Sequence, residues 1–361
     1  MTVTSLDILL VVGAVSYVYI LWRRRVLLST KRQLTSRVQA DHGTAKFAVS
    51  GSMEVSQIFI HPIKSCRGTS VQQAEYTPGG LKYDRRFAII DATTHKVITA
   101  REISHMVLVN PQLVQDPSAS NGGRLVVTFP PDSGGAEFTV PLCPDQNTLK
   151  SWDILNDVEL WGKDVDGYIC PGAANATLSR FLQRDVLLVY KGPRARPCPP
   201  TYAFPHLDAS AAYQDAYPLL VANDASLGAV EERVRDFAER GEKGVDPRWG
   251  KEKLAIERFR PNIVIHGANP WAEDDWEEIE VGGCVTITLV SKCTRCLLPN
   301  VDTKTGKRDA AVPHKVLMSF RTGLDPARMT KACFGCNGVP HGSGSIRVGD
   351  SVRVTHATSV A

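Results

Sequence analysis

Residues 291–306 read SKCTRCLLPNVDTKTG and place Cys293 and Cys296 three positions apart, with an arginine next to the second. A second pair at the same spacing, Cys333 and Cys336, follows after a gap of 36 residues. Two close pairs match a four-thiolate zinc site, although this gap is long for a zinc ribbon. A redox pair and plain buried cysteines are further interpretations. The spacing alone does not decide between them, so the rest of the chain has to.

The composition is that of a globular chain of 361 residues, with 43% hydrophobic and 22% charged residues. Its nine cysteines are an odd number and lie scattered, which favours a reducing compartment over a disulfide framework. The formal charge of +4 comes from one segment, because residues 23–37 carry six basic residues and no acid. The rest of the chain sums to −2, so we expect no nucleic acid among its partners.

The first 25 residues are expected to form a membrane anchor. Residues 8–22 read ILLVVGAVSYVYILW and carry no charge, and three arginines follow at once. This run is short for a span of about 20 residues, so a buried core helix is the alternative. A cleaved signal peptide does not fit, because its positive charge should precede the apolar run. Since the basic flank follows the span, the body should face the cytosol, with the outer mitochondrial membrane favoured over the endoplasmic reticulum.

The remainder of the chain is typical of an α+β protein rich in strands. After a linker over residues 26–52, alternating apolar residues predict a β-rich domain over 53–165, with KVITA at 96–100 among its strands. A second domain over 175–358 contains two amphipathic helices that begin at Asn175 and Ser226, each capped by that residue, and then further strands. Long helices are few, which argues against a parallel doubly wound sheet.

Seven short motifs occur in order after residue 53. They are HPIKSCRG (61–68), YDRRFAIID (83–91), ITARE (98–102), ERFRPNIVI (257–265), CTRCLLPNVDTKTG (293–306), FGCNGVP (334–340) and IRVGDSV (346–352). Together they resemble the MOSC family of molybdenum-cofactor proteins, and most closely its mitochondrial amidoxime reducing components. The resemblance implies an N-terminal MOSC-associated β domain, then a β-barrel-like MOSC domain with flanking helices.

The resemblance assigns the two cysteines of the first pair different roles. In that family the second cysteine binds molybdenum through its thiolate, and in this sequence it is Cys296. A thiolate is a soft ligand, which suits a metal already held by the dithiolene of a pterin. Arg295 beside it is expected to help keep the thiol ionised. Cys293 would then have no ligand role, and the second pair would be incidental.

Further residues match the family's positions for binding the pterin and its phosphate. They are Lys64, Ser65, Arg85, Asp215, Ala216, Tyr217, Arg260, Asn262, Thr294, Arg295 and Asn337. Arginine grips a phosphate with two parallel bonds, while lysine and hydroxyl groups add single donors. The chain departs from the family at Ala216 and Tyr217, which replace two hydroxyl residues. A cofactor contact through those hydroxyls would be lost, whereas one through backbone amides would remain.

The resemblance implies a molybdenum-cofactor-dependent reductase of N-oxygenated compounds such as amidoximes, hydroxylamines and N-oxides. The chain has no G-x-G-x-x-G fingerprint after a strand and no plant-type iron–sulfur spacing, so electrons should come from outside. The resemblance implies cytochrome b5 and NADH-cytochrome b5 reductase as the donors. One alternative is a carrier that holds the cofactor without reductase activity. Others are a cofactor sulfurase, for whose pyridoxal-phosphate domain there is no room upstream, and a zinc-stabilised membrane scaffold.

Overall fold

The computed structural model describes residues 52–131 and 133–358, which lie within one compact unit, Val49–Ala361. The predicted anchor (1–25) and all but the last residue of the predicted linker (26–52) lie outside the described residues. Within the described ranges, no helix is long and apolar enough to cross a membrane. The described part of the chain holds twenty strands and four α-helices, which confirms the β-rich fold class.

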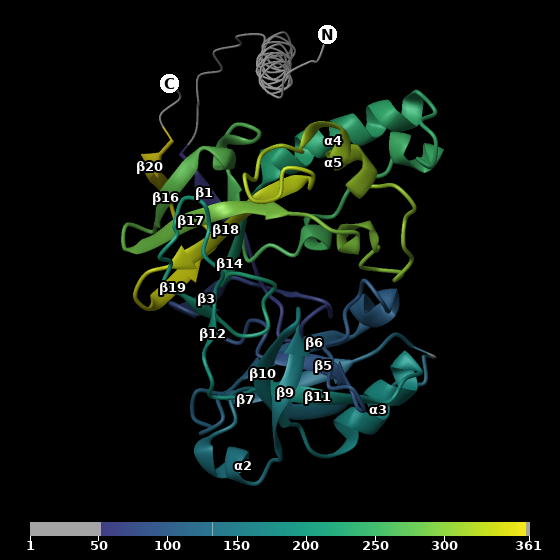
Figure 1. Ribbon diagram of the computed structural model, residues 1–361, viewed down its shortest axis with the longest axis vertical. Helices are drawn as coiled ribbons and strands as arrows, with labels where there is room; N and C mark the ends of the chain where they lie inside the picture. The colour runs from purple at the N-terminus through teal and green to yellow at the C-terminus, as the bar shows by residue number, and fades with distance from the viewer. Residues whose placement is uncertain (1–51, 132, 359–361) are drawn as a thin grey trace, which may run out of the picture. The chain divides into compact units, whose positions relative to one another are not determined.

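The largest sheet has eight strands and draws them from both ends of the described chain (Figure 1). Its order is β2 (Thr69–Val71), β1 (Glu54–Ile60), β15 (Ile263–His266), β14 (Leu219–Asn223), β18 (Cys333–Pro340), β17 (Val285–Thr294), β16 (Trp276–Val281) and β20 (Val352–Ala357). All neighbours run antiparallel except β14 and β15. The prediction that the fold is not a parallel doubly wound sheet is therefore confirmed.

This sheet curls towards a barrel, because the start of β1 meets the start of β20. The amide of Val55 donates to the carbonyl of Asp350 at 2.9 Å, and the amide of Val352 donates to that of Met53 at 2.8 Å. Gly349 donates to the carbonyl of Val55 at 2.8 Å. The start of β1, beyond the short strand β2, is thus bonded to the start of β20 at the opposite end of the sheet. This curl agrees with the barrel-like domain that the resemblance implied.

The remaining strands form four smaller sheets. They are β5 (Phe87–Asp91), β11 (Val186–Lys191), β10 (Lys163–Ile169) and β9 (Ile154–Leu160); β6 (Asn110–Gln115), β7 (Gly123–Thr128) and β8 (Phe138–Pro141); β19 (Gly344–Arg347), β3 (Gln73–Thr77) and β4 (Gly80–Leu81); and β12 (Arg196–Pro197) with β13 (Ser210–Ala211).

The prediction of a strand over residues 96–100 is wrong. Val97 makes a single bridge to Ile90. The amide of Glu102 then donates to the carbonyl of Thr99 in a turn that ends the extended stretch.

The predicted division of the chain between residues 165 and 175 stays a prediction. In the structure, β1 and β2 join the large sheet, whose other strands come after residue 218. Conversely, β11 follows residue 175 but pairs with β5 and β10. The first predicted domain therefore supplies two strands to the large sheet, and the second supplies β11 to the sheet that contains β5, β10 and β9. This strand exchange holds the loops between the two predicted domains in place.

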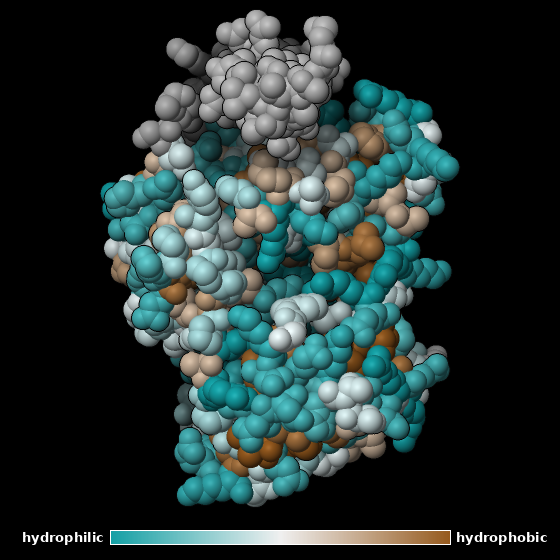
Figure 2. Space-filling model, in the orientation of Figure 1, coloured by the Kyte–Doolittle hydropathy of each residue, from teal (hydrophilic) through white to brown (hydrophobic). Residues whose placement is uncertain are grey.

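Four α-helices and five 3₁₀ turns complete the described elements. They are α2 (Gln146–Lys150), α3 (Ala173–Leu182), α4 (Asp224–Glu239), α5 (His314–Phe320), η1 (Ser104–Leu108), η2 (Pro247–Gly250), η3 (Ile256–Phe259), η4 (Ala272–Asp274) and η5 (Leu298–Asn300). Figure 1 shows α3 beside β11, and α4 with α5 together on one side of the large sheet. On the face in Figure 2, hydrophilic residues separate the apolar patches. The main apolar clusters consist of buried residues.

Both predicted helices exist, but both predicted N-caps are wrong. In α3, Gly172 is the N-cap, and Asn175 instead donates to the carbonyl of Cys170 at 3.0 Å and accepts from the amide of Leu188 at 2.8 Å. In α4, Asn223 accepts from the amide of Ala225 at 3.0 Å and is the cap. Ser226 is buried, and its hydroxyl donates to the carboxylate of Glu273 at 2.8 Å. In both cases a contact with another element takes the side chain that would have capped the helix.

Candidate functional site

All the residues predicted for the site line one cavity of about 1440 Å³. Lys64 and Ser65 lie between β1 and β2, Arg85 precedes β5, and the loop before β14 supplies Asp215, Ala216 and Tyr217. Arg260 and Asn262 lie between η3 and β15, Thr294 ends β17, Arg295 and Cys296 follow it, and Asn337 belongs to β18. The fold thus brings together residues from distant parts of the chain. What each of them does there stays a prediction.

The wall of this cavity is strongly basic. Eleven lysine and arginine residues line it, against three acidic residues. The basic residues are Lys64, Arg85, Arg101, Lys163, Arg196, Arg260, Lys292, Arg295, Arg308, Arg328 and Lys331. Outside residues 23–37 the chain as a whole carries a formal charge of −2, so the fold concentrates positive charge here. A concave wall of one sign focuses the electrostatic field, which suits an anionic ligand.

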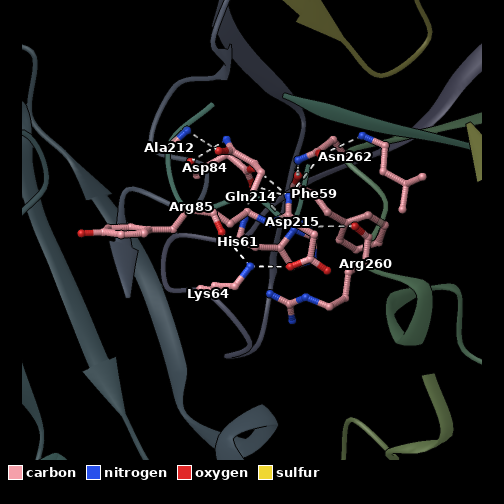
Figure 3. A network of polar contacts seen from close by, with 12 residues as sticks. Phe59, His61, Lys64, Asp84, Arg85, Ala212, Gln214, Asp215, Arg260 and Asn262 are labelled. Atoms are coloured by element: carbon pink, nitrogen blue, oxygen red, sulfur yellow. Dashed lines mark hydrogen bonds and ion pairs between the residues drawn. The ribbon is translucent and has the colours of Figure 1, made fainter. Parts of the chain in front are cut away.

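Lys64 is a buried cation with two partners (Figure 3). Its ammonium forms an ion pair with the carboxylate of Asp215 and donates to the carbonyl of Tyr213 at 2.8 Å. Burial lowers the pKa of Lys64 to about 8, although the negative charge of Asp215 opposes that shift. The ammonium is therefore charged at neutral pH but holds its proton far less tightly than a lysine in water.

Arg85 holds three parts of the cavity wall together (Figure 3). Its Nη1 donates to the two carboxylate oxygens of the buried Asp84, at 2.8 and 2.6 Å, and to Oδ1 of Asn262 at 3.1 Å. Its Nη2 donates to the carbonyl of Arg260 at 3.1 Å. Both terminal nitrogens of Arg85 thus donate to protein groups, so the main contacts of Arg85 position its neighbours in the cavity wall.

Arg260 has a buried donor that the protein leaves unused. Its Nη1 donates to the carbonyl of Cys66, whereas its Nη2 is buried without a hydrogen-bond partner among the described residues. Burial, reinforced by the positive charge of Arg85, lowers the pKa of Arg260 to about 9. A buried cationic donor without a partner costs free energy that an anionic ligand would recover. Nε of Arg295 is another orphan of this kind on the same wall.

Three of the predicted site residues have a left-handed backbone although none is glycine. The φ angles are 68° at Ser65, 48° at Arg85 and 58° at Arg260. Such conformations cost roughly 1 kcal/mol or more each, and they cluster where a site requires a particular geometry. Here they turn the chain at the three places from which the Lys64, Arg85 and Arg260 side chains reach the cavity.

The guanidinium of Arg295 contacts Cys293, and the expected help of Arg295 in keeping Cys296 ionised stays a prediction. Its Nη1 donates to the sulfur of Cys293 at 3.0 Å, and its Nη2 donates to the carbonyl of Phe259 at 2.7 Å. Among the described residues it makes no hydrogen bond to Cys296, so the arginine is committed to the other thiol of the pair. Burial raises the pKa of Cys293, and Arg295 opposes this only in part. Cys296 is partly exposed and lines the cavity.

The second cysteine pair does not form a metal site with the first. Cys333 and Cys336 are buried on β18, and burial raises the pKa of Cys333 to about 12 and that of Cys336 well above its ordinary value. The thiol of Cys336 donates to the carbonyl of Glu273 at 3.1 Å. No group of three or more His, Cys, Asp or Glu side chains in the described ranges is arranged to hold a metal. The four cysteines therefore do not form the tetrahedral zinc site that their spacing allowed.

Asn262 is buried, and its side chain makes three hydrogen bonds to protein groups. Its Oδ1 accepts from Arg85 and from the amide of Leu220, each at 3.1 Å, and its Nδ2 donates to the carbonyl of Phe59 at 3.2 Å (Figure 3). These contacts tie β1, β14 and Arg85 together beneath the cavity. Asn262 therefore helps to position the cavity wall, whatever contact it makes with a ligand.

Three other predicted polar residues line the cavity and bind protein groups. Oγ1 of Thr294 accepts from Arg328 at 3.1 Å. The hydroxyl of Tyr217, one of the two substituted positions, donates to the carbonyl of Pro199 at 3.2 Å. Nδ2 of Asn337 donates to the hydroxyl of Ser291 at 3.0 Å and to the carbonyl of Lys292 at 3.4 Å.

Three further residues of the cavity were not predicted from the sequence. Arg196 is buried and donates to the carbonyls of Ala212 and Gln214 at 2.7 and 2.8 Å, which fixes the loop that carries Asp215. Arg101 belongs to the ITARE motif (98–102), so this motif could have identified it as a residue of the site. Trp161 lies between β9 and β10, where no motif pointed to it.

Two family descriptions match this chain. The MOSC N-terminal beta barrel domain matches residues 52–185, and the MOSC domain matches residues 208–353. The YUAD protein of Bacillus subtilis, a solved structure, is matched over 84% of this chain and 94% of its own, with a TM-score of 0.32 and 9% identity.

Curated relatives match most of the chain. Mitochondrial amidoxime-reducing component 1 of Mus musculus is 32% identical over 308 residues, which cover 82% of this chain and 81% of the relative. Component 2 of Bos taurus is 30% identical over 311 residues, and component 1 of Homo sapiens is 29% identical over 309, each covering 82% of both chains. The chain therefore belongs to the MOSC-domain family, among the homologues of the mitochondrial amidoxime reducing components.

Proposed function

We propose that this protein is a molybdenum-cofactor-dependent reductase that removes the oxygen from N-oxygenated compounds such as amidoximes, hydroxylamines and N-oxides. Membership of the family supports an oxidoreductase, and the names of the relatives state amidoxime reduction for those proteins. The single observation that carries the proposal is the cavity itself. Its basic wall surrounds Cys296, a partly exposed thiol outside any protein metal cluster of the described residues.

The cavity fits a pterin cofactor that carries a phosphate. Its volume of about 1440 Å³ exceeds the roughly 300–1,000 Å³ of ordinary small-molecule sites, which leaves room for a cofactor and a substrate together. The orphaned donors of Arg260 and Arg295 supply charge for anionic groups. Cys296 would provide the soft thiolate ligand for molybdenum, while Lys64 and Arg260 would hold the anionic part of the cofactor.

The proposed reaction consumes two electrons and two protons and releases the substrate oxygen as water. The bound cofactor would supply two-electron oxygen-atom transfer chemistry. The chain's own residues would orient the reactants and supply charge: Lys64 and Arg260 hold anionic groups, and Arg85 and Asn262 keep the wall in place. Lys64 has a pKa near 8, so its Nζ is suited to exchanging a proton with the cavity at neutral pH.

The proposal extends to the electron donors and to the membrane. Cytochrome b5 and NADH-cytochrome b5 reductase would supply the electrons, since the sequence has no dinucleotide fingerprint and no plant-type iron–sulfur spacing. Residues 1–25 would anchor the body on the cytosolic side of the outer mitochondrial membrane, as their uncharged run and basic flank indicate.

The test is a turnover assay on the purified protein together with metal and pterin analysis. We expect about one molybdenum and one pterin per chain. Benzamidoxime should drive NADH oxidation only when cytochrome b5 and its reductase are both present. NADH oxidation by the protein alone would refute the external donors. A protein that holds the cofactor but reduces no N-oxygenated compound in the complete system would be a cofactor carrier and not a reductase.

A further inference from the structure

Trp161 occupies an unusual backbone position at the mouth of the cavity. It forms, with Gly162, the two-residue connection between β9 and β10, and their φ angles are 56° and 74°. Two positive φ angles define a type I′ turn, which prefers Asn, Asp or Gly at the first position. Tryptophan has no advantage in such a turn. Its presence therefore calls for an explanation outside the hairpin.

The indole of Trp161 is connected to the basic wall. The guanidinium carbon of Arg101 lies 4.1 Å from the indole ring centre, and the Lys64 ammonium lies 5.4 Å from it. Arg101 in turn lies 3.8 Å from the carboxylate of Asp215, which is the ion-pair partner of Lys64. These contacts hold the indole in a defined orientation, while 46% of the residue stays exposed.

Three exposed apolar side chains of the described residues line this cavity. Seven large hydrophobic residues are exposed: Val114, Ile154, Trp161, Tyr202, Leu297, Met318 and Met329. Trp161, Tyr202 and Leu297 line the cavity, and Leu297 directly follows Cys296. An otherwise basic cavity thus has apolar surface that its anionic ligand does not need. That surface suits the hydrophobic part of a second molecule.

We propose that Trp161 determines substrate specificity by packing against the planar aromatic part of an N-hydroxylated substrate. This inference rests on the proposed function and adds the recognition element. The polar N–O group would enter the basic interior, and the aryl ring would lie on the exposed indole surface that Arg101 keeps in place. An aryl substrate gains this contact, and a small alkyl substrate has nothing to place there.

Trp161→Asn is the decisive variant, because asparagine fits the type I′ turn and so keeps the hairpin while removing the indole. For the cofactor-loaded enzyme we expect the KM for benzamidoxime to rise about 2- to 10-fold, the size of one aromatic contact. The KM for acetamidoxime should change less than 2-fold, and kcat for both should stay within 2-fold. Trp161→Phe should restore most of the benzamidoxime affinity. Ile154→Ala is the matched control, since Ile154 starts β9, is 42% exposed and lies outside the cavity wall.

A second readout separates this inference from the proposed function. Without an electron donor, calorimetry should show benzamidoxime binding to the wild-type holoenzyme and 2- to 10-fold weaker binding to Trp161→Asn. Equal losses for benzamidoxime and acetamidoxime, or none for either, would overturn the role of Trp161 while leaving the reductase intact. Absence of turnover in the wild type with both substrates would overturn the reductase. The calorimetric comparison would still decide whether Trp161 binds an aryl group.

Discussion

Arg295 donates a hydrogen bond from Nη1 to the sulfur of Cys293, two residues before it in the chain, over 3.0 Å. Both thiols line the cavity, but Cys293 is held by a protein partner, whereas Cys296 makes no side-chain hydrogen bond among the described residues. The two thiols of one short motif therefore differ in their hydrogen bonding. The thiol of Cys296 has no protein partner to give up and is the one available as a ligand.

Cys296→Ala should abolish turnover and lower the molybdenum content, because it removes the proposed thiolate ligand. Cys293→Ala should cost on the order of 1 kcal/mol of stability and leave the molybdenum in place. Cys333→Ala and Cys336→Ala should likewise retain activity, since burial keeps both groups as thiols. The measurement is activity, molybdenum and zinc content in the four variants. Equal loss in all four, with zinc and no molybdenum in the parent, would contradict this assignment.

The stability of the cofactor-free protein should rise between pH 8 and pH 10. Burial lowers the pKa of Lys64 to about 8 from an ordinary 10.5, so the unfolded chain binds more protons in this window. The free energy of unfolding then increases with pH, by up to about 1.4 kcal/mol per pH unit for one group. Binding of inorganic phosphate should change in the opposite direction and weaken, because the neutral amine attracts anions less.

Urea unfolding at pH 7.5 and pH 9.5 checks the Lys64 prediction. Lys64→Gln should reduce the rise, and the part that remains above pH 9 is expected from Arg260, because burial lowers the pKa of that residue to about 9. Lys82→Gln is the matched control, because Lys82 is partly exposed and pairs with Glu75 at 2.7 Å, which raises its pKa out of the window. The same rise in the wild type and in Lys64→Gln would show that Lys64 is not its source.

Glu273→Gln should stabilise the protein at pH 8 but not at pH 5. Burial raises the pKa of Glu273 to about 7 from an ordinary 4.5, although Asn223 and Ser226 donate to its carboxylate. The folded state therefore binds more protons between these values, and stability falls as the pH rises from 4.5 to 7. The neutral amide avoids this loss, so we expect a gain of about 1 to 2 kcal/mol at pH 8. Denaturant unfolding at both pH values tests it, with the exposed Glu232→Gln on α4 as the control.

Asn262→Ala should destabilise the fold even without cofactor. It leaves Arg85, the amide of Leu220 and the carbonyl of Phe59 without their buried partner, which costs about 2 to 4 kcal/mol. Asn337→Ala is the matched control, because Asn337 also lines the cavity but makes less buried hydrogen bonds. It should lower the free energy of unfolding by less than about 1 kcal/mol. Equal stability of the two cofactor-free variants would mean that Asn262 serves the ligand rather than the fold.

Sequence motifs identified which residues meet in the cavity, because those residues sit at family positions that can be matched one by one. Motifs say little about where a side chain points. Arg295 is adjacent to Cys296 in the chain, yet its guanidinium lies against Cys293. The same limit applies to Trp161: nothing in its local pattern indicates that a hairpin between β9 and β10 reaches the cavity.

Local patterns identified the β-rich character of the chain and both amphipathic helices, but tertiary contacts overrode the details. Ser226 is a good capping residue by type, yet its hydroxyl binds Glu273, and Asn223 caps α4 instead. The segment CFGCNGVP contains two glycines and no clear alternation, so propensity gives no sign of a strand. It is nevertheless the strand β18, because β14 and β17 bind it on both sides.

The pairing of β1 with β15 has a consequence for how the protein is made. Val55 pairs with Ile265, 210 positions later in the chain. At a synthesis rate of roughly 5–20 residues per second, the apolar strand β1 would leave the ribosome about 10–40 seconds before its partner exists. Through that interval Ile58 and Ile60 have only the short strand β2 to pair with, and the other edge of β1 stays open, so the nascent chain should need a chaperone. A fragment that stops before residue 263 leaves that edge without β15, and we expect it to aggregate when expressed alone.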